Sequence, residues 1–365
     1  MSETDFRTSL VLAQSTALAR RGAAALAKRG LSDLESLDSA EVWLQKAKEL
    51  YNAVPREYSV AQFRFSLGEF LRCLQRAARC DPQHSGVQCW LATAYRDGLG
   101  AEADLAEAAK WFRRAADQGV AQAQYELANM FEFGEGVPQD SAEAVRLYQM
   151  ASEQGHIDAQ LALGAAYADG SGVNQNLAES ARWFWRAAEK GSDLGQYFLA
   201  EAIVEGKGVP RSDTEAAAWY RKSAEQGLAS ARYKLGLMYM KGDGVEKDLG
   251  EAARWFLKAA IQEYSSAQFQ LGHMYLHGSW FQKDYVQAFS YLRKAAEPRD
   301  NLGRSELGTT MLAQVELATM YLKGYGVAKD TQQSQFWFRQ SVATQKQLSK
   351  LKQQSLSGHD RELYR

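Results

Sequence analysis

The sequence predicts an all-α solenoid, a stack of antiparallel helix pairs with a 36-residue period. Three observations carry this prediction: evenly spaced loop glycines, a large side chain at a fixed distance after each glycine, and a helix start signal between the two. No segment shows the sustained period-two alternation that indicates a half-buried strand. Two short helices cannot each bury an apolar face alone, so consecutive pairs must stack into one continuous core.

The loop glycines mark seven repeats. Five successive intervals between them are 36 residues long, and the sixth is 46 residues long. Each glycine is expected to end the first helix of its repeat, because the backbone after a helix often turns left-handed and glycine adopts that conformation without steric cost. The seven glycines are Gly98, Gly134, Gly170, Gly206, Gly242, Gly278 and Gly324.

The second helix of each repeat has its own start signal and its own large apolar residue. The start signal is Asp, Asn or Ser followed three residues later by Glu or Gln, which is a capping box that satisfies backbone N–H groups of the first turn. The start residues are Asp104, Asp140, Asn176, Ser212, Asp248, Asp284 and Asp330. The large residues that follow are Trp111, Leu147, Trp183, Trp219, Trp255, Tyr291 and Trp337.

The repeats define the domain organisation that we expect. Residues 1–55 form a helical N-terminal lead-in, and residues 56–85 form irregular capping helices. The seven repeats span residues 86–345, with a ten-residue insertion near 297–307 that we expect to lie in a loop. Residues 346–365 are polar and form a C-terminal cap or tail.

Two stretches carry a resemblance to a known family. They are AQAQYELANMFEFGEGVPQDSAEAVRLYQMASEQG (121–155) and ASARYKLGLMYMKGDGVEKDLGEAARWFLKAA (229–260). Their recurring Leu-Gly-x-Met-Tyr-x-x-Gly-x-Gly-Val-x-x-Asp pattern resembles the Sel1-like repeat (SLR), which is related to the tetratricopeptide repeat. The resemblance covers about residues 86–345. It implies a right-handed superhelix of antiparallel helix pairs and a role as an adaptor that assembles complexes, here in a bacterial cell.

Composition restricts the kinds of partner. The net charge of −1 gives no overall field that favours nucleic acid. No stretch approaches the roughly 20 apolar residues of a membrane-spanning helix, and the N-terminus lacks a basic and then apolar secretion signal. Three cysteines without a framework spacing suit a reducing compartment. We therefore expect a cytoplasmic protein that does not bind nucleic acid and has no membrane span.

A partner-binding groove is predicted by analogy with tetratricopeptide packing, in which the first helix of each pair lines the concave surface. The residues expected to face this groove are Asn129, Glu132, Phe133, Asp169, Glu201, Glu205, Met240, Lys241, His273, His277 and Lys323, with Leu276 between the two histidines. Acidic residues gather in the middle of the groove, and Lys and His gather towards its later end. A peptide or protein with basic and then acidic character would match this polarity.

The pattern fails in the stretch that runs from the end of the fifth repeat into the sixth. Glu263 replaces a closing glycine, and Trp280 and Phe281 replace the Gly-Val of the loop. An exposed tryptophan in a loop is a candidate interface anchor. The other interpretation is that both rings pack under the insertion at 297–307. Both interpretations remain open, and we name Trp280 and Phe281 as a candidate loop contact.

No enzyme motif stands out. The Gly-Lys-Gly in EGKGVP (205–210) belongs to a repeat loop and lacks the spacing of a phosphate-binding loop. The sequence therefore predicts a non-enzymatic scaffold without cofactor or metal. Two alternatives are kept. His273 and His277, four residues apart on one helix face, would serve a metal-dependent regulator or enzyme. Self-assembly into a structural protein, through weak self-association, is the other.

Overall fold

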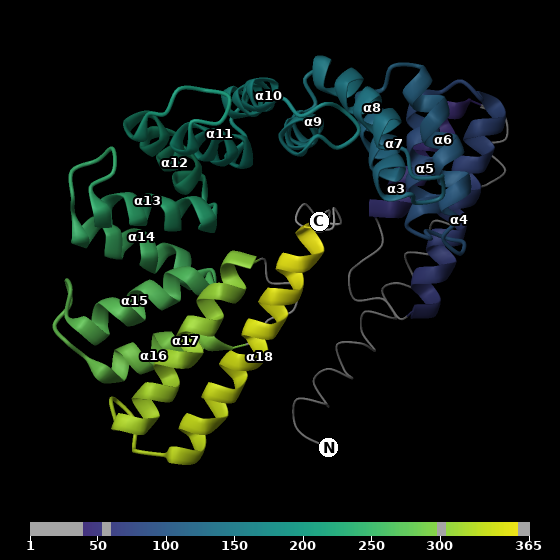
Figure 1. Ribbon diagram of the computed structural model, residues 1–365. Helices are drawn as coiled ribbons and strands as arrows, with labels where there is room; N and C mark the ends of the chain where they lie inside the picture. The colour runs from purple at the N-terminus through teal and green to yellow at the C-terminus, as the bar shows by residue number, and fades with distance from the viewer. Residues whose placement is uncertain (1–38, 53–59, 298–303, 357–365) are drawn as a thin grey trace. The chain divides into compact units, whose positions relative to one another are not determined.

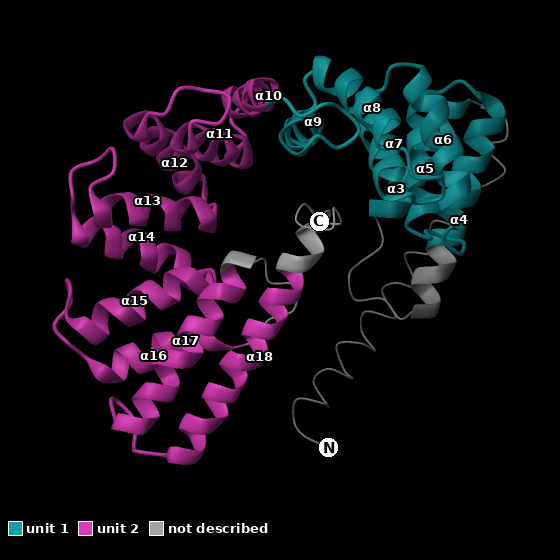
Figure 2. Cartoon of the chain, in the orientation of Figure 1, with its two compact units in different colours: residues 1–176 teal, residues 177–365 magenta. Residues whose placement is uncertain are grey.

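The computed structural model describes residues 39–52, 60–297 and 304–356. These residues form sixteen helices, α3 to α18, and contain no strand (Figure 1). The all-α prediction is therefore confirmed. The chain divides into two compact units, residues 1–176 and 177–365 (Figure 2).

Helices of the first unit pack in chain order: α3 on α4, α4 on α5, and so on to α9. Their bounds are α3 Ala40–Asn52, α4 Val60–Cys80, α5 Ser85–Arg96, α6 Leu105–Asp117, α7 Ala121–Phe133, α8 Ser141–Glu153 and α9 Ile157–Asp169. The core at the N-terminal end joins Trp43 of α3, Phe70 of α4 and Leu91 of α5. Within the lead-in predicted for residues 1–55, α3 is described, and residues 1–38 and 53–55 lie outside the described residues.

The second unit continues the same pattern, with each helix packed on the next one in the chain. Its helices are α10 Leu177–Glu189, α11 Asp193–Glu205, α12 Asp213–Gln226, α13 Ala229–Lys241, α14 Leu249–Ile261, α15 Ser265–His277, α16 Tyr285–Ala296, α17 Arg304–Lys323 and α18 Thr331–Leu356. One core cluster shows how pairs stack, because it combines Phe256 of α14 with Leu271 and Met274 of α15. Consecutive repeats thus share a core.

The predicted helix start and stop signals form the capping hydrogen bonds and the left-handed backbone expected of them. At the start of α12 the Ser212 hydroxyl accepts a hydrogen bond from the Glu215 N–H at 3.3 Å, and at the start of α6 an Asp104 carboxylate oxygen accepts from the Glu107 N–H at 2.9 Å. Gly206 ends α11 with a φ of 65°. These local signals set the boundaries of both helices of a repeat.

The second glycine of each Gly-x-Gly loop permits a close approach between neighbouring repeats. A Cβ atom on Gly208 would lie 2.0 Å from the Leu177 carbonyl oxygen, and a Cβ on Gly244 would lie 2.2 Å from the Asp213 carbonyl oxygen. The loop of one repeat therefore rests on the first turn of the preceding second helix. A side chain at this position would separate the repeats.

The last repeat differs from the others at both ends. Residues 304–307, expected in a loop, form the first turn of α17, whereas residues 298–303 lie outside the described residues. No described repeat follows α18, and the Phe338 side chain is 57% exposed although Phe256, at the equivalent position of α14, is 0% exposed. The stacking of repeats, rather than the helix pair alone, buries this position.

Candidate functional site

The predicted groove residues lie at the C-terminal ends of the first helices. Four of them belong to α7 and α9 in the first unit, and seven belong to α11, α13, α15 and α17 in the second. None of them is buried, as a binding surface requires. Leu276, between the two histidines, was also expected to face the groove. It is instead buried in the core between α15, α16 and α17. The expectation that Leu276 faces the groove was therefore wrong.

In the first unit a buried tyrosine supports the polar end of α7. The Tyr148 hydroxyl of α8 lies 2.5 Å from Glu132 Oε2 and 2.5 Å from Asn129 Oδ1. Burial, followed by the nearby Glu132 charge, raises the pKa of Tyr148 far above its usual value. The hydroxyl therefore stays protonated and donates to α7. Burial also raises the pKa of Asp169 at the end of α9.

The second unit repeats this arrangement one turn from the end of α11. The buried Tyr220 of α12 donates its hydroxyl hydrogen to Glu201. The Lys234 ammonium of α13 lies 2.8 Å from Glu201 Oε1, and the Lys207 ammonium lies 2.6 Å from Glu205 Oε2. These two lysines partly neutralise the carboxylates, so this surface is less acidic than a count of its predicted residues suggests.

The histidine pair has a carboxylate neighbour that the sequence analysis did not select. The ring centroids of His273 and His277 are 4.5 Å apart, and His273 Nε2 lies 3.8 Å from Glu316 Oε1 on α17. The nearby His273 side chain is the main cause that lowers the pKa of Glu316. Within residues 39–52, 60–297 and 304–356, no group of three or more His, Cys, Asp or Glu side chains could hold a metal ion.

Trp280 and Phe281 contact helices that precede the insertion. The Trp280 side chain is 58% exposed, yet its ring lies against α14, because a Cβ on Gly250 would be 2.7 Å from Trp280 Cζ2. Phe281 stacks on Tyr275 with ring centroids 4.2 Å apart. At this junction the bulky residue is in the loop of the sixth repeat, and the glycine is on the second helix of the fifth repeat. Gly250 is thus the sequence signal that accounts for Trp280.

The cysteines lie in the first unit. Cys73 is buried, Cys89 is partly buried and Cys80 is exposed, and all three are free thiols. Burial is the first cause that raises the pKa of Cys89, to about 11, so its thiol is protonated near neutral pH.

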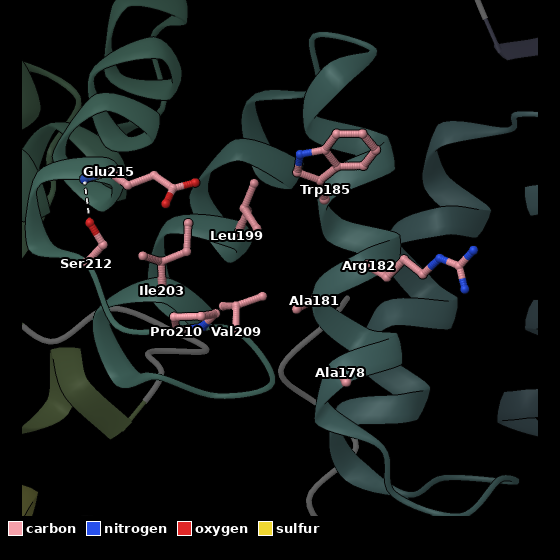
Figure 3. Close-up of a pocket in the computed structure, with 10 residues that line it drawn as sticks. All are labelled: Ala178, Ala181, Arg182, Trp185, Leu199, Ile203, Val209, Pro210, Ser212 and Glu215. Atoms are coloured by element: carbon pink, nitrogen blue, oxygen red, sulfur yellow. Dashed lines mark hydrogen bonds between the residues drawn. The ribbon is translucent and has the colours of Figure 1, made fainter.

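One pocket of about 350 Å³ lies between α10, α11 and the loop that leads into α12 (Figure 3). Sequence reasoning did not identify it. It is on the side of α11 opposite the groove residues Glu201 and Glu205, since positions two residues apart on a helix point about 200° apart. The lining residues are Ala178, Ala181, Arg182, Trp185, Leu199, Ile203, Val209, Pro210, Ser212 and Glu215.

The geometry above matches a repeat family, and the chain belongs to it: the Sel1 repeat family. The matched segments are residues 86–120, 121–156, 157–192, 193–228, 229–264, 265–297 and 312–343. The resemblance inferred from the sequence is therefore confirmed over seven repeats. No curated protein that was compared with the chain matches it. No helix in the described part of the chain is long and apolar enough to cross a membrane.

Two solved structures resemble the chain over most of their length. A Sel1 repeat protein from Oxalobacter formigenes is 26% identical, with a TM-score of 0.67, and the match covers 90% of this chain and 92% of that protein. A protective antigen of uropathogenic Escherichia coli strains, which displays an SLR fold, is 27% identical, with a TM-score of 0.61 and coverage of 88% and 81%. Both support the architecture of stacked helix pairs.

Proposed function

We propose that this protein is a non-enzymatic interaction scaffold that binds a protein or peptide on the surface formed by the C-terminal ends of its first helices. The observation that carries the proposal is the repetition of accessible polar residues at one register in successive Sel1 repeats. A solenoid presents such residues as an extended surface, whereas its second helices supply the fully buried aromatic side chains, such as Phe112, Tyr148 and Phe256. The Sel1 repeat fold supports a role in protein interaction. The shared position of the polar residues in successive repeats supports the first-helix ends as the binding surface.

The chemistry of the second unit suggests what kind of partner binds there. Glu201 and Glu205 offer carboxylates that already hold Lys234 and Lys207, so a basic partner would exchange one ion pair for another. Such exchanges favour correct register and fast association more than high affinity. Lys241 and Lys323 would receive acidic side chains of the same partner. We therefore propose a partner whose sequence changes from basic to acidic along its length.

The cellular setting belongs to the same proposal. We propose assembly of complexes in a bacterial cytoplasm, because all three cysteines are free thiols, as a reducing compartment allows. The histidine pair carries no second proposal, since no group of three or more His, Cys, Asp or Glu side chains among the described residues could hold a metal ion.

Affinity capture with matched charge variants tests the proposal. The protein would be immobilised, exposed to extract from its native host, and the retained proteins identified by mass spectrometry. The groove variant is Glu201→Lys with Glu205→Lys, and the matched control is Glu189→Lys with Glu225→Lys, two exposed residues on α10 and α12. We expect a partner that the wild type and the control retain and the groove variant loses.

The capture experiment has a clear contrary outcome. If the groove variant and the control retain the same proteins in the same amounts as the wild type, the surface of first-helix ends is not the binding surface. A purified protein whose mass in solution is a defined multiple of the chain mass would favour the self-assembling alternative instead.

A further inference from the structure

The pocket beside Trp185 lies where, in another repeat of this chain, an arginine side chain is bound. Arg113 of α6 extends towards the next repeat, and its guanidinium carbon is 5.0 Å from the centroid of the Phe131 ring. Its Nη1 lies 2.9 Å from Glu143 Oε1. A second cation, Arg146, also reaches Glu143, with its Nε 2.8 Å from Oε2. A ring, a carboxylate and two guanidinium groups therefore fill this junction.

Two 36-residue periods further along the chain, the equivalent positions no longer carry the two arginines and the phenylalanine. Trp185 takes the place of the first arginine, Ile203 takes the place of the phenylalanine ring, and Ala218 takes the place of the second arginine. Only the carboxylate is retained, as Glu215. The other repeats with a described first helix keep an aromatic residue at the position of Ile203: Tyr95, Tyr167, Tyr239, Tyr275 and Tyr321.

These exchanges leave a site with an aromatic wall, an apolar floor and an uncompensated carboxylate. The Trp185 side chain is 45% exposed at one wall, and Ile203 and Leu199 are buried at the floor. Figure 3 shows Glu215 across the pocket from Trp185. Glu215 forms no ion pair with any residue in the described part of the chain. Arg182 at the rim pairs instead with Glu179, with its Nη1 3.4 Å from Glu179 Oε1.

We propose that this pocket binds an arginine side chain of a partner protein. The guanidinium plane would stack on the Trp185 indole and pair with the Glu215 carboxylate, and the aliphatic stem would cover Ile203. Arginine fits better than lysine because its planar head stacks on a ring and meets a carboxylate with two parallel N–H donors. Arg113, Phe131 and Glu143 show the same pairing within one chain.

The site is separate from the groove in the proposed function, because it lies on the opposite side of α11. A partner arginine here would act as a second anchor, or as the anchor of a different partner. The two proposals can therefore fail independently. A variant with Glu201→Lys and Glu205→Lys should keep the arginine response described next.

Nuclear magnetic resonance on the full chain tests the site with a defined probe. The indole N–H signal of Trp185, assigned by its loss in Trp185→Phe, would be followed during titration with Nα-acetyl-arginine amide. We expect a saturable shift with wild-type protein, and no comparable shift with the citrulline analogue, which has nearly the same shape but no charge. The Glu215→Gln variant should weaken binding by about tenfold or more, because the charge-assisted hydrogen bonds are lost.

A variant that fills the pocket controls for arginine binding elsewhere on the protein surface. Ile203→Tyr restores the ring found in the other repeats and should abolish the shift while the protein stays folded. The proposal is overturned if arginine amide at millimolar concentration leaves the Trp185 signal unmoved. It is equally overturned if citrulline gives the same shift, or if Glu215→Gln and Ile203→Tyr bind as the wild type does.

Discussion

Replacing Phe256 with alanine should destabilise the protein much more than the same change at Phe338. Both residues occupy the same position of a second helix, in α14 and α18. Phe256 is fully buried: its Cε1 is 2.6 Å from where a Cβ on Gly236 of its own repeat would lie. It also shares a core cluster with Leu271 and Met274 of α15 in the next repeat. Phe338 has no described repeat behind it and is 57% exposed. Comparing the two variants separates the stability that comes from packing between repeats from the stability that comes from packing within one helix pair.

The magnitudes follow from burial. Deleting a fully buried phenylalanine side chain costs about 3–5 kcal/mol of unfolding free energy. A buried aromatic side chain removes about 150–250 Å² from water, at about 25 cal/mol per Å². Phe338 buries roughly two fifths of its surface and would leave no closed cavity, so its loss should cost about 1.6–2.7 kcal/mol.

Urea unfolding, followed by circular dichroism of the helices, measures both variants under one set of conditions. We expect Phe256→Ala to lower the free energy of unfolding by about twice as much as Phe338→Ala does. Equal losses would show that burial between repeats does not determine the stability of this position.

Three further predictions concern single positions. Glu263 is the only non-glycine residue with a positive φ in the described part of the chain, 61°, so Glu263→Gly should stabilise the protein by about 0.5–1 kcal/mol in thermal unfolding, and a lower melting temperature would contradict this. Gly208→Ala should cost about 2 kcal/mol more than Gly191→Ala, because both have positive φ but a Cβ on Gly191 would have no atom within 4 Å. The lowered pKa of Glu316 stabilises the fold above the ordinary carboxyl range, and this contribution is lost as pH falls through the depressed value; carboxyl carbon resonances should show a higher Glu316 pKa in His273→Ala, and an unchanged pKa would contradict the assigned cause.

Element boundaries were predictable from the sequence because their causes are local. The Ser212 hydroxyl binds the backbone N–H of Glu215, three residues away, and Gly206 needs only its own left-handed φ of 65° to end α11. Such signals repeat with the period, so each one confirms the next. The same regularity placed the groove residues at accessible helix ends.

The rest of the site depends on pairs that are far apart in the sequence. Lys234 neutralises Glu201 from the next repeat, and Gly250 accommodates the ring of Trp280 from 30 residues away. The pocket can be recognised from the sequence only when Trp185, Ile203 and Glu215 are compared together with the equivalent three residues of another repeat. Each substitution is unremarkable by itself, so a search for single unusual residues passes over the pocket.

Hydrogen–deuterium exchange on the protein with and without its captured partner tests the central claim most directly, because it reports which helices the partner covers. We expect slower exchange of backbone amides at the C-terminal ends of the first helices, at 201–205, 237–241 and 273–277, with second helices such as α12 and α14 little changed. Protection confined to the second helices, or absent from these three segments, would contradict the claim that the first-helix ends form the binding surface.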